Sequence, residues 1–161
     1  MGEKLVNVKA DNVDDFLKNV DGAIGEGAGV MGNTTYMIKP QYKQTDGKIT
    51  SVDFKLEVNI TRAHWSGGKA DDANKKAIKD AEDLNKKHEL KHKAIAEKIC
   101  AAEFAKAKKK LIGKDESEVQ DAVDDISKEI DDEYVKLDKR EGKTDVTTTS
   151  AGKFVVKQVG E

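Results

Sequence analysis

The feature that most constrains this chain is the stretch from residue 69 to residue 141, which contains no proline. Ala, Lys, Glu and Asp dominate this stretch, and its apolar residues recur at spacings of three and four, the period of a helix with one buried face. The pattern predicts two successive amphipathic helices, the first over about residues 69–110 and the second beyond a break at residues 112–115. Since a short joint places successive helices side by side, we expect an antiparallel helical hairpin.

Each predicted helix has a recognisable buried face. On the first helix this face carries Ala77, Ala81, Leu84, His88, His92, Ile95, Ile99 and Ala102. On the second it carries Val119, Val123, Ile126, Ile130, Glu133 and Leu137. The charges support the pairing, because residues 86–110 are rich in Lys and residues 115–133 are rich in Asp and Glu.

Residues 1–66 differ from the helical part, because they hold most of the Val, Thr, Tyr and Gly. Near-alternating apolar positions over residues 34–43 and 49–61 predict two strands, and the Asp-Gly pair between them predicts an antiparallel β-hairpin. A short strand is expected near residues 5–10, followed by a short helix over residues 13–20.

We therefore expect one α+β domain over residues 1–161. Its β-rich part, residues 1–66, forms a small antiparallel β-sheet with a short helix. The helical hairpin of residues 69–141 follows, and residues 146–161 form either a loose tail or an edge strand.

Composition excludes several classes of protein. The chain has 161 residues and a formal net charge of −2, which argues against a dedicated nucleic-acid binder. A single cysteine excludes an internal disulfide framework and a four-cysteine zinc site. No apolar run approaches the ~20 residues of a membrane span. The N-terminal segment lacks a secretory apolar region, so we expect a cytosolic protein or a mature form without its signal.

The chemistry of the chain is indicated by the sequence His88-Glu89-Leu90-Lys91-His92 in the first predicted helix. Residues four apart lie one above the other on a helix, so the two imidazoles can bind one zinc ion. Glu89 lies at the edge of that face, where it can take a proton from the attacking water. The alternative is a pair of partly buried histidines with ordinary hydrogen-bond partners.

A catalytic zinc site needs a third protein ligand and an open position. The hairpin places the motif opposite residues 134–138, so an acid on the second helix is the best candidate. Glu133 is preferred because it falls on the apolar stripe, where an acid is costly unless it is paired or bound to a metal. Asp138 and Glu141 are alternatives on the same helix, and His64 is the candidate from outside it.

Two further side chains near the predicted site have both a chemical and a structural interpretation. Tyr134 can stabilise the oxyanion that forms on the scissile carbonyl, or it can simply pack in the core. Cys100 has no suitable His and Asn partners, so we expect a buried, unreactive thiol and not a nucleophile.

In the order of these parts, the chain resembles a bacterial family of predicted secreted zinc-dependent proteases, long described as a domain of unknown function. The resemblance covers about residues 4–145: the first strand and helix (LVNVKADNVDDFLKNV), a sheet segment ending at a Trp (VNITRAHW), the helical HELKH and the segment KLDKREGKTD. The family's downstream segment usually reads Tyr-Asp-x-Glu-Thr-x-His-Gly. Asp138 matches its Asp, and Glu141 matches its Glu with a shift of one residue.

This chain departs from the family pattern after Glu141, because positions 143–145 are Lys, Thr and Asp and no His follows. If the late His of the family is a ligand, the resemblance implies that Asp145 or another acid replaces it. The resemblance also implies a periplasmic or secreted location.

We expect a zinc-dependent metallopeptidase that hydrolyses peptide bonds of a protein or peptide substrate, with no nucleic-acid partner. His88, His92 and an acid hold the zinc, and Glu89 acts as the base. The alternative is a non-catalytic interaction or scaffold module, whose basic face over residues 86–110 binds an acidic partner. The peptidase requires an acid that converges on the histidine pair as the third ligand, and the scaffold module does not.

Overall fold

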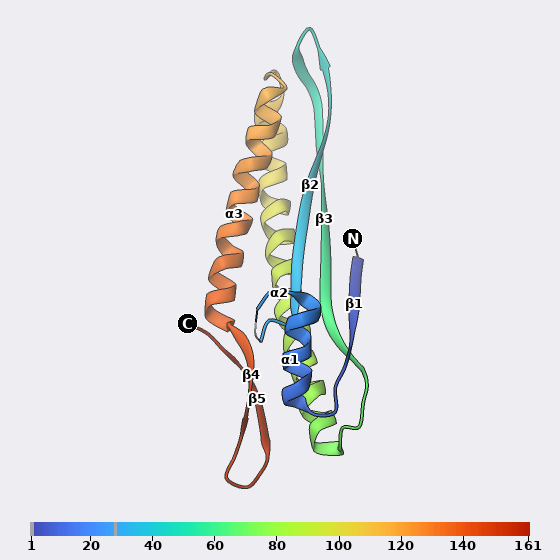
Figure 1. Cartoon of the computed structure of the whole chain (residues 1–161). Coiled ribbons are helices and arrows are strands. Elements are labelled where there is room, and N and C mark those ends of the chain that lie inside the picture. The colour runs from blue at the N-terminus through green and yellow to red at the C-terminus, as the bar shows by residue number, and fades with distance from the viewer. Residues whose placement is uncertain (1, 28) are drawn as a thin grey trace.

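The computed structural model of the chain describes residues 2–27 and 29–161. In this part, three helices and two small sheets form a mixed α+β structure (Figure 1), so the α+β class that the sequence predicts is confirmed. The elements are β1 (Gly2–Lys9), α1 (Val13–Ile24), β2 (Gly32–Thr45), β3 (Lys48–Gly67), α2 (Asp72–Leu111), α3 (Ser117–Glu141), β4 (Lys143–Thr148) and β5 (Phe154–Val159).

Strands β2 and β3 form a long antiparallel ribbon joined by a two-residue turn. Asp46 and Gly47, the two turn residues, both have positive φ angles of 54° and 74°. Such a turn matches the right-handed twist of the two strands, and Asp-Gly is one of the pairs that adopts it readily. The predicted hairpin is therefore confirmed.

The pairing of β1 corrects the prediction of a purely antiparallel sheet. The strand order is β1-β3-β2, and β1 runs parallel to β3. A parallel pair needs a long connection between its strands, and here α1 and the whole of β2 provide it. Because this pairing joins residues about 57 positions apart, such as Gly2 and Asn59, no local pattern in the sequence shows it.

Helices α2 and α3 lie side by side in the upper half of Figure 1, with the β2–β3 ribbon beside them. Asp71 caps the first turn of α2 by accepting a hydrogen bond from the backbone N–H of Asn74. The joint between α2 and α3 is fixed to the start of β3, because the backbone of Ile49 bonds to both Gly113 and Lys114.

The buried face of α2 differs from the predicted stripe beyond the motif. Ala96 and Cys100 are buried, whereas Ile95 and Ile99 are only half-buried and Ala102 is exposed. The stripe continues from His92 in steps of four. This helix packs along a twisted ribbon and a second helix at once, and its contact line is set by both.

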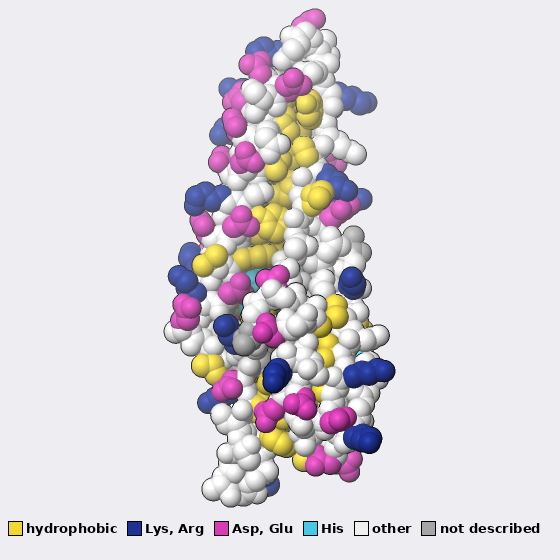
Figure 2. Space-filling model, viewed as in Figure 1, with side chains coloured by type: hydrophobic (Ala, Val, Ile, Leu, Met, Phe, Trp, Pro, Cys, Tyr) yellow, Lys and Arg dark blue, Asp and Glu magenta, His cyan; other side chains and the backbone are white. Residues whose placement is uncertain are grey.

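Two hydrophobic clusters lie along the molecule. The first, between α2, α3 and the ribbon, contains Ile38, Ile49, Phe54, Val58, Ile60, Ala96, Cys100, Ala107, Leu111, Val119, Val123, Ile126 and Ile130. The second, around α1, contains Val8, Ala10, Val13, Phe16, Val20, Met31, Ala63, Ala70, Ala77, Ile78 and Ala81. Figure 2 shows apolar side chains as a band between α3 and β2, with charged side chains on either side. On α2, the buried polar residues Asn85, His88, Glu89 and His92 fall between the two clusters.

The C-terminal segment forms a second sheet, in which β4 and β5 pair antiparallel. It is therefore neither a loose tail nor an edge strand of the first sheet. A Cβ atom on Gly142 would lie 1.6 Å from the carbonyl oxygen of Val159, so β5 passes directly against the end of α3. Within residues 2–27 and 29–161, no helix combines the length and the apolar character needed to cross a membrane.

We predict that Gly142→Ala destabilises the protein by at least ~1 kcal/mol more than Gly152→Ala. Both glycines have positive φ, at 67° and 77°, but only Gly142 lacks room for a methyl group. Chemical denaturation of both variants measures the difference, and equal free energies of unfolding would contradict the observed packing of β5 on α3.

Candidate metal centre

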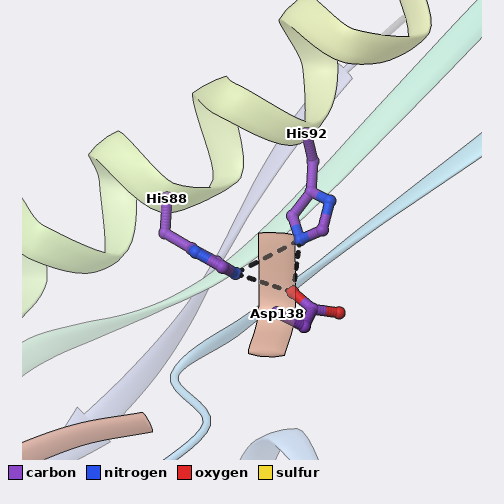
Figure 3. A group of neighbouring side chains, drawn as sticks. All are labelled: His88, His92 and Asp138. Carbon is purple, nitrogen blue, oxygen red and sulfur yellow. Dashed lines mark hydrogen bonds and ion pairs between the residues drawn. The ribbon is translucent and has the colours of Figure 1, made fainter. Parts of the chain in front are cut away.

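The two histidines of the motif lie one turn apart on the inner face of α2. Their side chains are almost completely buried, and the two Nε2 atoms are 3.2 Å apart (Figure 3). The rings meet nearly at right angles, with centroids 4.7 Å apart. The helical spacing that the sequence predicts therefore brings both Nε2 atoms to one point.

Asp138 of α3 completes this group. Its Oδ1 atom lies 3.0 Å from Nε2 of His88 and 2.7 Å from Nε2 of His92 (Figure 3). Within the described residues, these three side chains are the one group of His, Cys, Asp or Glu whose ligand atoms converge closely enough to hold a metal ion. An acid thus converges on the histidine pair as the third member of the group.

The donor set and its spacing fit a zinc ion. Neighbouring ligand atoms in a tetrahedral site with bonds of ~2.0–2.1 Å are ~3.3 Å apart. The separations of 2.7, 3.0 and 3.2 Å are somewhat shorter than that value, so small side-chain rotations would admit the ion. Burial lowers the pKa of His92, although the charge of Asp138 opposes this, and the neutral imidazole is the form that binds metals. The Nδ1 atom of each histidine, which is not among the converging atoms, is buried without a hydrogen-bond partner.

Glu133, the preferred third ligand at the sequence level, lies outside this group. Its side chain pairs with Lys136 at 2.9 Å and does not join the converging ligand atoms. The buried face of α3 passes from Ile130 through the half-buried Tyr134 to Leu137, so the step after Ile130 is four residues and not three. With that step, Asp138 faces α2, and the alternative acid is the one beside the histidines.

The other candidate ligands occupy different places. His64 is half-exposed and pairs with Glu82 at 3.0 Å, and it does not join the group. Asp145 is an exposed residue of β4. Glu141 lies behind His88, with its Oε2 atom 3.6 Å from Nδ1, and it forms an ion pair with Lys91. Burial tends to raise the pKa of Glu141, but the hydrogen bond and charge of Lys91 outweigh this and lower it.

Glu89 is buried next to the group, with 3% of its surface exposed. The hydroxyl of Thr34, on β2, donates a hydrogen bond to its Oε2 atom. Burial raises the pKa of Glu89, while the hydrogen bond from Thr34 and the proximity of His88 oppose that rise. A carboxylate with a raised pKa is suited to both taking up and releasing a proton.

Sequence reasoning missed Thr34 and Asn85. Asn85 donates from Nδ2 to the backbone oxygen of Met31 at 3.2 Å, which fixes the start of β2 against α2. It stands four residues after Ala81 and three before His88, so its place on the buried stripe was a readable signal. Thr34 carried no such signal, because a threonine at an inward strand position is common.

Tyr134 packs against neighbouring aromatic rings, and its hydroxyl group has no hydrogen-bond partner. Its ring centroid is 4.3 Å from that of His92, and it packs edge-on against Tyr36. The hydroxyl is buried without a hydrogen-bond partner, and burial raises its pKa, so it stays protonated and able to donate.

A cavity of about 750 Å³ opens beside these groups. Residues from five regions surround it: the start of β2 and the segment before it, α2, the end of α3, the start of β4 and the end of β5. They include Met31, Thr34, Asn85, His88, Glu89, His92, Tyr134, Asp138, Lys143 and Val159. The cavity therefore gives a ligand access to the histidines, Glu89 and Tyr134 together.

Cys100 lies two turns beyond His92 and is buried in the first cluster. Burial raises the pKa of its thiol to about 11. The thiol is therefore protonated near neutral pH, as expected for a structural cysteine.

Comparison with protein families finds a match over most of the chain. The sequence model of a family described as a bacterial protein of unknown function (DUF922) matches residues 5–145. That range contains the histidine pair, Glu89 and Asp138. No curated protein and no solved structure matches the chain significantly.

We predict that Asp138→Ala weakens zinc binding by more than ~100-fold, because a site with two imidazoles loses its third protein ligand. Glu133→Ala, a change to an acid of the same helix that lies outside the group, and His64→Ala leave the affinity unchanged. Competition with a chelating dye at fixed pH measures all three. Equal losses in Asp138→Ala and Glu133→Ala, or a large loss in His64→Ala alone, would contradict the assignment.

Proposed function

The chain belongs to this bacterial family of unknown function, and we propose that it is a zinc-dependent peptidase. The observation that carries the proposal is the convergence of Asp138 on the Nε2 atoms of His88 and His92. Two histidines and one carboxylate form a common ligand set of catalytic zinc, which leaves a position open for water or substrate. A scaffold protein has no need of this arrangement.

In this proposal α2 and α3 form the hairpin that holds the metal. Helix α2 supplies His88 and His92, and α3 supplies Asp138. When bound, zinc supplies a Lewis acid that polarises a carbonyl group and lowers the pKa of water. The remaining steps belong to side chains of this chain.

Glu89 is the proposed base and acid. One of its oxygens is held by the hydroxyl of Thr34, and the residue also borders the cavity. It takes a proton from the attacking water as the oxygen of that water bonds to the carbonyl carbon. It then gives the proton to the leaving nitrogen as the C–N bond breaks, so the proton balance closes within one residue.

Tyr134 is the proposed donor to the oxyanion. Its unpartnered hydroxyl and its position on the cavity wall, beside His92, support this role. A donor fixed in a buried site stabilises the charge that develops on the carbonyl oxygen without first reorienting.

A protein or peptide is the proposed substrate. The cavity volume falls within the range of about 300–1,000 Å³ that is usual for ligand sites. Both polar and apolar residues line it, as recognition of a peptide requires. The competing hypothesis, a non-catalytic scaffold, predicts that peptide hydrolysis is absent even in zinc-loaded protein.

We predict that Glu89→Gln keeps stoichiometric zinc and loses hydrolysis by ~10²–10⁴-fold, the usual contribution of a general base. The amide preserves the shape of the side chain and cannot take up the proton. Glu97→Gln, the same change at an exposed position of α2, is the matched control and keeps full activity.

Cleavage of a quenched fluorescent peptide library, together with metal analysis of each protein, measures both quantities. Loss of zinc in Glu89→Gln, or full activity in that variant, would remove Glu89 from the proposed mechanism. No cleavage by zinc-loaded wild type at any library position would favour the scaffold hypothesis.

A further inference from the structure

We propose that Glu141 is a positioning residue, which holds the imidazole of His88 through Nδ1 and thereby directs Nε2 at the metal. The inference rests on the proposed zinc site and goes beyond it, because it gives a function to an acid that is not a ligand. Glu141 is the last residue of α3.

The first observation is the environment of the His88 ring. Its Nδ1 atom is buried and has no hydrogen-bond partner, although a neutral imidazole that uses Nε2 as a ligand carries its proton on Nδ1. The Oε2 atom of Glu141 is the nearest carboxylate oxygen to this nitrogen, at 3.6 Å. The gap exceeds a normal hydrogen bond by a few tenths of an ångström, which a small rotation of either side chain removes.

The second observation is the spacing of the two acids. Asp138 and Glu141 are three residues apart on α3, so they lie on the same face of the helix. Asp138 reaches the Nε2 side of the His88 ring, and Glu141 reaches the Nδ1 side. One helix face therefore contacts both nitrogens of the same imidazole.

The third observation is that Glu141 is itself held in place. Its side chain is only 13% exposed, and its other oxygen, Oε1, is paired with Lys91. Lys91 stands three residues after His88 on α2, so the carboxylate is fixed to the helix that carries the ring. The Lys91 ammonium also balances the negative charge of the Glu141 carboxylate.

The second histidine provides an internal comparison. Nδ1 of His92 is also buried without a partner, but in the described residues no carboxylate other than that of Asp138 forms an ion pair with this ring. Its face packs against Tyr134 instead. The two rings are thus held by different means, and loss of Glu141 removes a carboxylate beside Nδ1 of His88 but none beside Nδ1 of His92.

The physical consequence concerns the tautomer. A carboxylate that accepts a hydrogen bond from Nδ1–H fixes the proton there, leaves the Nε2 lone pair for the metal and makes that nitrogen more basic. Loss of such a partner typically weakens metal affinity by ~10–100-fold.

The test is a set of zinc dissociation constants, measured by competition with a chelating dye at fixed pH. We expect Glu141→Ala to weaken binding by ~10–100-fold, and Glu141→Gln to weaken it less, because the amide oxygen still accepts from Nδ1–H. Glu133→Gln is the matched control, an acid of the same helix without contact to the site, and it leaves the affinity within about twofold.

A second readout separates positioning from general destabilisation. In the ¹⁵N spectrum of zinc-loaded wild type, we expect a slowly exchanging Nδ1–H signal from His88. Glu141→Ala broadens or loses that signal, whereas the signals of His92 change less. Equal affinities and unchanged spectra in Glu141→Ala and Glu133→Gln would overturn the inference and leave the zinc site intact.

The failure of this inference and that of the proposed function are distinguishable. A wild type that binds zinc with the graded losses above, yet cleaves no peptide, would support the role of Glu141 and contradict the peptidase. A wild type that binds zinc no better than His88→Ala would overturn both. A loss in Glu141→Ala as complete as that in Asp138→Ala would make Glu141 a ligand and overturn the positioning role.

Discussion

The structure around the motif depends on the convergence of two buried imidazoles and one carboxylate at a single point between two helices. Buried polar groups without partners cost roughly 1–3 kcal/mol each, and this site contains several of them. The Nδ1 atoms of both histidines and the hydroxyl of Tyr134 have no hydrogen-bond partner. Among the described residues, these are the buried side-chain polar atoms that lack a partner, and the two histidines lie between the two hydrophobic clusters along α2. In the proposed site, the Tyr134 hydroxyl is free to donate to a bound substrate.

The remainder of the fold holds this point in place from several directions. The ribbon of β2 and β3 supports α2 along its length, and Asn85 and Thr34 tie the start of that ribbon to the motif. The end of α3 carries Asp138 and packs against β5, because the backbone of Val159 leaves no room for a side chain at Gly142. Each group of the site therefore lies on a regular helix or strand, which is the arrangement that fixes ligand geometry most closely.

Features that depend on local spacing could be predicted from the sequence. The histidine pair, the break between the two long helices and the Asp-Gly turn all depend on residues a few positions apart. The identity of the third candidate ligand depended on which face of α3 packs against α2. The sequence pattern was continued three residues beyond Ile130, to Glu133, whereas the buried face continues four residues beyond it, which brings Asp138 to the histidines. The parallel pairing of β1 and the contact of Thr34 with Glu89 join residues about 55 positions apart, and no local period encodes such contacts.

The central claim is that His88, His92 and Asp138 bind one zinc ion. Crystals of protein purified without added metal, measured on both sides of the zinc absorption edge, test it directly. We predict one anomalous-difference peak between Nε2 of His88, Nε2 of His92 and Oδ1 of Asp138. A peak elsewhere, for example beside His64 and Glu82, or the absence of any peak in crystals soaked with zinc, would contradict it.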